Sequence, residues 1–229
     1  MNIITNEKLI KRNARIGQVT NIVSLAILGV GMYITFKSPE QFSLSLTALL
    51  IGFLLSQIGI YFTNRWGKSP RPDEQLNKAL KGLDKKYTLF HYTTPASHLL
   101  TGPAGIWVLF PKNQKGRIVY EKNRWKQKGG GLLSGYLKIF AQDSLGRPDL
   151  EISSETDAIK KFLSTKIPEL STPDINAALV LTHPDAKADA DNAPVPTLHS
   201  QNLKDYLRKF AKKKPISSET LHIINDSFK

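Results

Sequence analysis

The architecture is decided by residues 16–64, which read IGQVTNIVSLAILGVGMYITF (16–36), KSPE (37–40) and QFSLSLTALLIGFLLSQIGIYFTN (41–64). The two apolar runs contain 21 and 24 residues and no charged side chain. Helices of these lengths rise roughly 30 Å or more at about 1.5 Å per residue, which matches the hydrocarbon thickness of a bilayer. We therefore predict a two-helix transmembrane hairpin, with spans at residues 16–36 and 41–64 and a tight reversal at Pro39.

Polar and small residues interrupt the two runs. Asn21 and Ser45 are polar side chains that can hydrogen-bond across a hairpin to the partner helix. Gly29 and Gly31 are the glycines that we expect where the two helices approach most closely. A soluble helical hairpin is disfavoured, because neither run has a polar face.

Basic residues flank the outer ends of the hairpin far more than its reversal. Those at the outer ends are Lys8, Lys11, Arg12, Arg15, Arg65, Lys68 and Arg71, against Lys37 alone between the spans. By the positive-inside rule we expect both chain ends to be cytoplasmic. We interpret the membrane as a bacterial-type inner (plasma) membrane. A cleaved signal peptide is the alternative, because the N-terminal residues 1–15 are basic. It is disfavoured by the length of the first run, by the lack of a small-residue cleavage site and by the second span.

The remaining composition limits the chemistry. The 229 residues include 32 Lys and Arg against 19 Asp and Glu, a formal net charge of +13, and no Cys. Without cysteine, disulfides, zinc knuckles, iron–sulfur sites and cysteine nucleophiles are excluded. Only seven basic and two acidic residues precede residue 69, so most of the excess charge follows the hairpin. Such an excess suggests an anionic partner, either a phosphate polymer or the acidic face of a membrane.

Residues 65–72 form a short linker to an α+β domain at residues 73–212, which is followed by a tail or short helix at 213–229. Hydrophobic spacing predicts helices over 73–83, from a capping box at Ser154 and Asp157 to 165, and from a cap at Ser200 to 210. A last helix is expected at 219–228. Strands are predicted over 87–92, 97–101, 105–110, 116–120 and 177–182, and loops over 126–150 and 185–196.

The strand at 105–110 has apolar residues on both sides. Ile106, Val108 and Phe110 share one face, while Trp107 and Leu109 share the other. Continuous apolarity of this kind predicts a strand that is covered on both faces. The domain is therefore expected to be a sandwich of helices and sheet.

Several segments of the domain occur in a recognisable order. They are Glu74-Gln75-Leu76, then Ala96-Ser97-His98-Leu99-Leu100, then Gly102-Pro103-Ala104-Gly105-Ile106-Trp107-Val108-Leu109 with Lys112 and Trp125 after it, and finally Ala178-Leu179-Val180-Leu181-Thr182. In this order the sequence resembles the nuclease-related domain (NERD) family of the PD-(D/E)xK nuclease superfamily, over roughly residues 73–210. The resemblance implies a restriction-endonuclease-like αβ sandwich.

Nucleases of that superfamily hold Mg²⁺ with a strand Asp and with a Glu two residues before a catalytic Lys. In this chain the Asp position holds Ser97 and the Glu position holds Phe110, so only the motif relics Glu74 and Lys112 remain. Serine is a neutral, poor ligand and phenylalanine is none, so we predict no metal site, no cofactor and no confident catalytic residue. We predict that His98 is a packed strand histidine, and the other histidines show no metal-ligand spacing.

A basic hairpin with interleaved aromatics follows the strand at 105–110. Its candidate binding residues are Lys112, Lys115, Arg117, Lys122, Arg124, Trp125, Lys126 and Lys128. Cations with aromatic residues are typical of a nucleic-acid surface. Two alternatives stay open: the same cations, with Lys212, Lys213 and Lys214, could lie against anionic lipid, or the hairpin could simply be solvated.

These observations predict a membrane-anchored, NERD-like protein whose domain binds or scaffolds at the cytoplasmic membrane face without catalysis. The runner-up is a metal-dependent nuclease acting on DNA or RNA. In that case Mg²⁺ would be its cofactor, and the missing carboxylates would come from residues such as Glu121, Asp143 or Glu151. The sequence names no protein partner.

Overall fold

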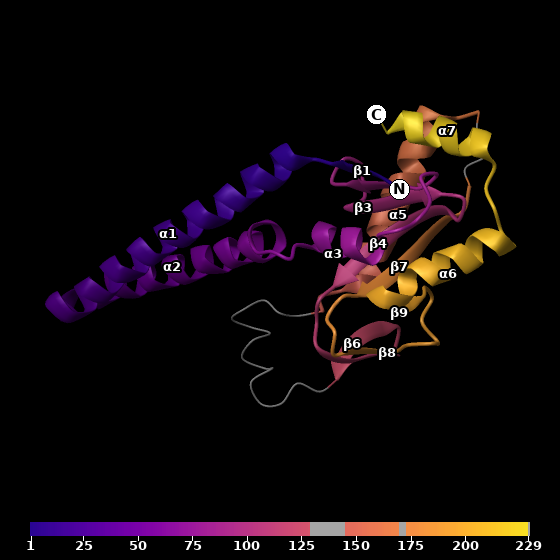
Figure 1. The fold of residues 1–229 in the computed structure, drawn as a ribbon. Helices are drawn as coiled ribbons and strands as arrows, with labels where there is room; N and C mark the ends of the chain where they lie inside the picture. Colours follow the sequence, from indigo (N-terminus) through magenta and orange to yellow (C-terminus); the bar gives the residue numbers. More distant parts are fainter. Residues whose placement is uncertain (129–144, 170–172, 229) are drawn as a thin grey trace. The chain divides into compact units, whose positions relative to one another are not determined.

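The structure is a computed structural model, and it describes residues 1–128, 145–169 and 173–228. The chain divides into two compact units (Figure 1). One is a helical unit within residues 7–71, and the other is a domain formed by Met1–Asn6 together with the described residues from Pro72 onward. The helical unit is thus an insertion between the first six residues of the domain and the rest of it.

The helical unit consists of α1 (Glu7–Lys37), the 3-10 turn η1 (Pro39–Gln41), α2 (Phe42–Phe62) and the π-helical turn η2 (Thr63–Gly67). The helices α1 and α2 lie side by side (Figure 1). Both contain a stretch long and apolar enough to cross a bilayer, so the two long apolar helices predicted from the sequence are confirmed. The first helix begins earlier than the apolar run, and Glu7 in its first turn favours that start.

Small residues line the contact between α1 and α2. The buried positions recur every seven residues: they are Gly17, Ser24 and Gly31 on α1, and Ser45, Gly52 and Gly59 on α2. A Cβ added to Gly52 would lie 2.7 Å from Leu28 Cγ, so only glycine fits there without a shift. Gly31 is at the contact as predicted, but the prediction for Gly29 is wrong, because no atom lies within 4 Å of a Cβ built there.

Polar side chains of the helical unit hydrogen-bond between the helices. Asn21 Nδ2 donates to Thr63 Oγ1 at 3.0 Å, and Ser45 Oγ donates to the carbonyl oxygen of Gly31 at 3.1 Å. The side chains that point outward are mostly large and apolar, among them Ile22, Leu25, Tyr33, Phe36, Phe42, Leu50 and Leu54. The unit therefore has a small, hydrogen-bonded interior and an apolar exterior, the reverse of a water-soluble hairpin.

The domain is built on a mixed six-stranded sheet in the order β1-β2-β3-β4-β7-β9. Its strands are β1 (Asn2–Thr5), β2 (Thr88–His91), β3 (His98–Gly102), β4 (Gly105–Lys112), β7 (Ile175–Leu181) and β9 (Thr197–His199). The strands β2, β3 and β4 form an antiparallel meander, whereas β1, β7 and β9 pair in parallel with their neighbours. The α+β class is confirmed, but β1 was missed inside the segment predicted as a basic N-terminus.

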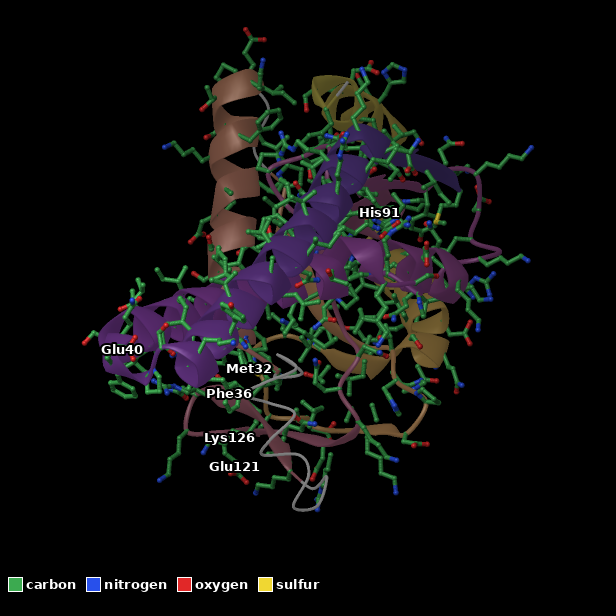
Figure 2. The ribbon with its side chains drawn as sticks, turned by 90° about the vertical axis from the view of Figure 1, so that its left-hand side faces the viewer. Met32, Phe36, Glu40, His91, Glu121 and Lys126 are labelled. Atoms are coloured by element: carbon green, nitrogen blue, oxygen red, sulfur yellow. The ribbon has the colours of Figure 1, made fainter. Side chains whose placement is uncertain are left out.

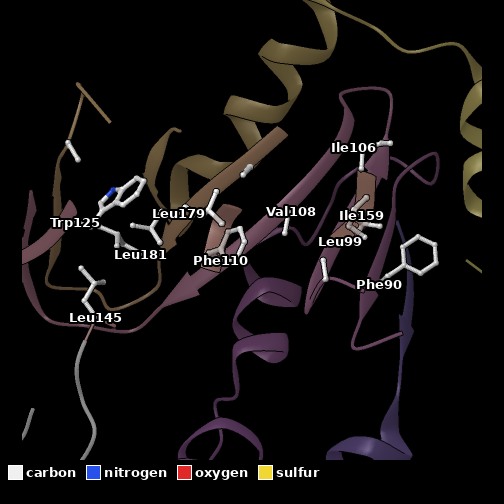
Figure 3. Packing of buried hydrophobic residues seen from close by; sticks show 14 of the residues in the cluster. Phe90, Leu99, Ile106, Val108, Phe110, Trp125, Leu145, Ile159, Leu179 and Leu181 are labelled. Carbon is white, nitrogen blue, oxygen red and sulfur yellow. The ribbon is translucent and has the colours of Figure 1, made fainter. Parts of the chain in front are cut away.

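Helices cover both faces of this sheet. On one face lie α3 (Pro72–Ala79) and α6 (Ser200–Lys213), and on the other lie α5 (Pro148–Lys166) and α7 (Ser218–Ser227). Ile106, Val108 and Phe110 pack in the cluster on the α5 side, shown in Figure 3, and Trp107 packs in the cluster on the α3 side. The prediction of a strand covered on both faces is confirmed.

A second sheet of three strands, in the order β6-β5-β8, adjoins the α5 side of the core. Its strands are β5 (Gly116–Glu121), β6 (Arg124–Lys128) and β8 (Ala186–Asp189). Both β8 and part of β6 fall in segments that we expected to be loops, so those two predictions are wrong in part. The remainder of the segment 126–150, up to residue 144, lies outside the described residues.

Two helix starts also differ from the sequence prediction. The helix α5 begins at Pro148, with Arg147 as its N-cap, so Ser154 and Asp157 lie inside the helix and form no capping box. Proline is well suited to the first helical position, since it lacks the N–H that would have no partner there. The N-cap of α6 is His199, whose side chain accepts from the N–H of Gln201, and not Ser200.

Candidate functional site

The three positions at which the resemblance implies a metal site face the same helix. Ser97 lies directly before β3, and Phe110 and Lys112 lie on β4. The N–H and Oγ of Ser97 donate to Glu155 Oε2 and Oε1 at 3.0 and 2.8 Å, and Glu155 belongs to α5. Ser97 and Phe110 therefore both point to the α5 side of the sheet.

Phe110 and Lys112 occupy that side in different ways. The ring of Phe110 is 4% exposed and packs in the core cluster with Leu179 and Val108 (Figure 3). Lys112 Nζ donates to both carboxylate oxygens of Glu151, at 3.0 and 2.8 Å, and the Lys112 side chain is only 16% exposed. A bidentate contact of this kind neutralises the carboxylate with an ammonium group.

Two of the four carboxylates of α5, those of Glu151 and Glu155, thus accept from donors on β4 or next to β3. Glu151 and Glu155 lie one helical turn apart, and each binds through both of its oxygens to Lys112 or to Ser97. Divalent metals need carboxylate oxygens that are open to the ion. Within the described residues, no group of three or more His, Asp or Glu side chains could hold a metal.

The other motif relic and the other proposed carboxylates lie elsewhere. Glu74 is in the first turn of α3, the helix on the opposite face of the sheet from α5. Glu121 is on β5, where Lys128 Nζ donates to it. Asp143 lies outside the described residues. Of the two considered carboxylates that the structure describes, Glu151 pairs with Lys112 and Glu121 pairs with Lys128.

His98 is packed, as the sequence predicted. It is 3% exposed, and its Nδ1 lies 2.8 Å from Nδ1 of the equally buried His91. His91 Nε2 lies 3.1 Å from Asn77 Oδ1 and donates to it, so a neutral His91 accepts at Nδ1 from His98. The side chain of Ser97 points to Glu155 on α5, and that of His98 points to His91. The two neighbours therefore do not form a pair of nucleophile and general base.

The outward side of the sheet β6-β5-β8 carries a concentration of positive charge, which we call the cationic face. It consists of Arg117, Arg124, Lys126, Lys128 and Lys187, with the carboxylates of Glu121 and Asp189. Arg117 stands directly opposite Lys128 on one side and Lys187 on the other. Three cations therefore lie in a row across strands that are about 4.8 Å apart, an arrangement that is destabilising unless anions lie near it.

The acidic residues of the cationic face compensate only part of this charge. Glu121 forms an ion pair with Lys128, and Asp189 forms one with Arg117. Within the described part of the chain, Arg124, Lys126 and Lys187 form no ion pair. The hydrogen bond from Lys128, together with the charges of Lys126 and Lys122, holds the pKa of Glu121 below its ordinary value. Figure 2 labels Glu121 and Lys126 among the side chains of this hairpin.

Trp125 does not belong to the cationic face. It is 5% exposed, its indole Nε1 donates to Thr197 Oγ1 at 2.9 Å, and its ring centroid lies 4.7 Å from that of Tyr120 (Figure 3). Because side chains alternate along a strand, the cations of β6 point outward while Trp125 points into the core. The prediction of a surface tryptophan is corrected, and the strict alternation of residues 124–128 was the signal that could have shown it.

Two other predicted cations, Lys115 and Lys122, lie next to the ends of β5. Lys115 forms an ion pair with Asp185 at 3.1 Å, and Lys122 lies in the β5–β6 turn with a positive φ of 51°. Lys214 pairs with Asp174. Lys187 was missed, because its strand was predicted to be a polar loop.

Comparison with protein-family models, with curated proteins and with solved structures finds no match for this chain.

Proposed function

We propose that this protein is anchored in a bacterial-type inner membrane by two spans, with both termini cytoplasmic, and that its domain is a non-catalytic binding module of NERD-like origin. The observation that carries the proposal is the pairing of Lys112 with Glu151 and of Ser97 with Glu155. If the resemblance holds, these contacts occupy the positions of the family's metal ligands, which supports a domain that binds without metal-dependent chemistry.

The helical unit supports the membrane anchor. Its interior is made of small residues and interhelical hydrogen bonds, and its exterior is apolar. The chain enters the unit from β1 and returns from it to α3, and both of these elements belong to one domain. Two crossings bring the chain back to its starting side of a bilayer, as that connectivity requires.

The order of elements supports the family resemblance. The chain contains, in this order, a helix (α3), an antiparallel meander (β2 to β4), a second helix (α5) and a strand parallel to β4 (β7), with β5 and β6 inserted between β4 and α5. We therefore propose a restriction-endonuclease-like fold for this domain. The side that would carry the metal is the side that α5 covers.

Calorimetric titration of Mg²⁺ and Mn²⁺ into the full chain, held in nanodiscs of zwitterionic lipid, tests the absence of catalysis. We expect no binding up to millimolar metal and no cleavage of single-stranded or duplex DNA or of RNA. Metal binding at micromolar to low-millimolar concentration, or cleavage that chelation abolishes, would contradict the proposal.

A metal-dependent nuclease is the second candidate, and the proximity of Glu151 to Lys112 favours it. In that case a metal would have to displace Lys112 Nζ from the carboxylate, after which the lysine could act on water. Lys112→Met separates the two candidates. If the protein is a nuclease, this substitution should abolish cleavage of DNA or RNA. If the domain is a binding module, neither the unsubstituted protein nor the variant should cleave.

A further inference from the structure

The cationic face has more positive charge than its own carboxylates can neutralise. Arg117, Lys128 and Lys187 lie in one row across three strands, and Lys126 and Arg124 continue the charge on the edge strand β6. The side chains of Arg117 and Lys128 remain 61% and 51% exposed despite their ion pairs. Such a row of like charges is unfavourable on its own, and an external anion that lies against it would offset the repulsion.

We infer that the cationic face binds the anionic headgroups of the membrane in which the helical unit is anchored. This inference rests on the membrane anchor proposed above and names the partner of the binding module. The headgroup phosphates supply the negative charge, and the exposed ammonium and guanidinium groups of Arg117, Lys126 and Lys187 receive it.

The orientation of the aromatic residues favours lipid over nucleic acid. Binding of single-stranded nucleic acid relies on exposed rings that stack on bases. Trp125 is buried and hydrogen-bonded to Thr197, and Tyr120 points to the same inner side of the sheet. Among the described residues, the cationic face therefore offers charge without a stacking platform, which suits a headgroup layer.

The length of the connections favours lipid as well. Asn6 alone separates β1 from α1, and residues 68–71 alone separate η2 from α3. Short tethers of this kind hold a domain at a high effective concentration relative to the surface in which its anchor lies. No such advantage exists for a freely diffusing polymer.

Lysine footprinting of the full chain tests the inference. The chain is held in nanodiscs of phosphatidylcholine, with or without phosphatidylglycerol, and exposed lysines are acylated and quantified by mass spectrometry. We expect acylation of Lys126 and Lys187 to fall about fivefold in the anionic discs. It should recover at about 1 M salt, where the Debye length is about 3 Å. Lys161 on α5 and Lys209 on α6 are exposed internal controls whose acylation should not change.

A charge-reversal pair gives the matched variants. Lys126→Glu with Lys187→Glu should abolish the protection of Lys128 in anionic discs, whereas Lys161→Glu with Lys209→Glu should preserve it. Equal acylation of Lys126 in both kinds of disc overturns the inference. Protection by duplex DNA but not by phosphatidylglycerol also overturns it, in favour of nucleic acid.

The proposed function and this inference fail in different ways. If the chain does not co-elute with zwitterionic nanodiscs, the membrane anchor is wrong and the inference falls with it. If the chain enters both kinds of disc and lipid charge changes no lysine, only headgroup binding is wrong.

Discussion

Removal of the Glu155 carboxylate should lower the stability of the domain more than removal of the neighbouring Asp157 carboxylate. Glu155→Ala takes the acceptor from both the N–H and the hydroxyl of Ser97, which lie at 3.0 and 2.8 Å. A hydrogen bond to a charged group contributes about 1.5–3 kcal/mol. Both residues are half-buried, so water replaces part of the lost contacts, and we expect a net loss of about 1–2 kcal/mol.

Asp157 is the matched control on the same helix. Its side chain is 66% exposed and forms a 3.6 Å ion pair with Lys160, so Asp157→Ala should change stability by no more than about 0.5 kcal/mol. The assay is urea unfolding of the full chain in zwitterionic nanodiscs, followed by the emission of the buried Trp107 and Trp125. Equal midpoints for the two variants would refute the role assigned to Glu155. A rise in metal affinity caused by Glu155→Gln would refute it too.

Three further predictions concern other parts of the chain. Trp125→Ala should lower the free energy of urea unfolding, followed by the emission of the remaining buried Trp107, by about 3–5 kcal/mol, because the Trp125 ring is buried; a loss below about 1 kcal/mol would place it on the surface. Gly52→Ala should destabilise the helical unit by about 1–3 kcal/mol, and Gly29→Ala should be neutral or stabilising, as measured by thermal loss of helical circular dichroism in micelles. Because the pKa of Glu121 is lowered in the fold, its stabilising effect is present above its ordinary pKa of 4.5 and is lost as the pH falls below it; Glu121→Gln should remove that part of the acid dependence of unfolding.

Hydrophobic patterns in the sequence predicted the helices and strands whose own residues carry a long, clear pattern. The uncharged runs predicted α1 and α2, and the apolar residues on both sides of β4 predicted that helices cover it. The period and the length of a hydrophobic pattern can be read from one segment, without knowing which other segment packs against it. The strand β1 could not be found in this way. It pairs with β2, whose residues lie more than 80 positions later in the chain, and four residues carry too little pattern.

In the candidate site, too, residue types could be predicted from the sequence, whereas contacts between distant segments could not. The residue types at Ser97 and Lys112 were visible in the sequence, but their partners Glu155 and Glu151 come from α5, about 40 to 60 positions later in the chain. Trp125 was misplaced because composition counts aromatics without their direction, which the pleat of β6 determines. Because Trp125 points inward, we now expect the cations of β6 to bind a charged lipid surface and not a nucleic acid whose bases stack on the ring.

Membrane insertion with both ends of the hairpin on one side is the central claim, and the absence of cysteine from the chain makes it directly measurable. Glu40→Cys places a single thiol in the exposed reversal η1, and Lys161→Cys places one on α5 of the domain. The measurement is labelling by a membrane-impermeant maleimide in intact bacterial cells with a permeable outer membrane, and again after lysis. We expect the thiol at position 40 to react in intact cells and the thiol at position 161 to react only after lysis. Equal reactivity of both thiols before lysis, or of neither, would contradict the account.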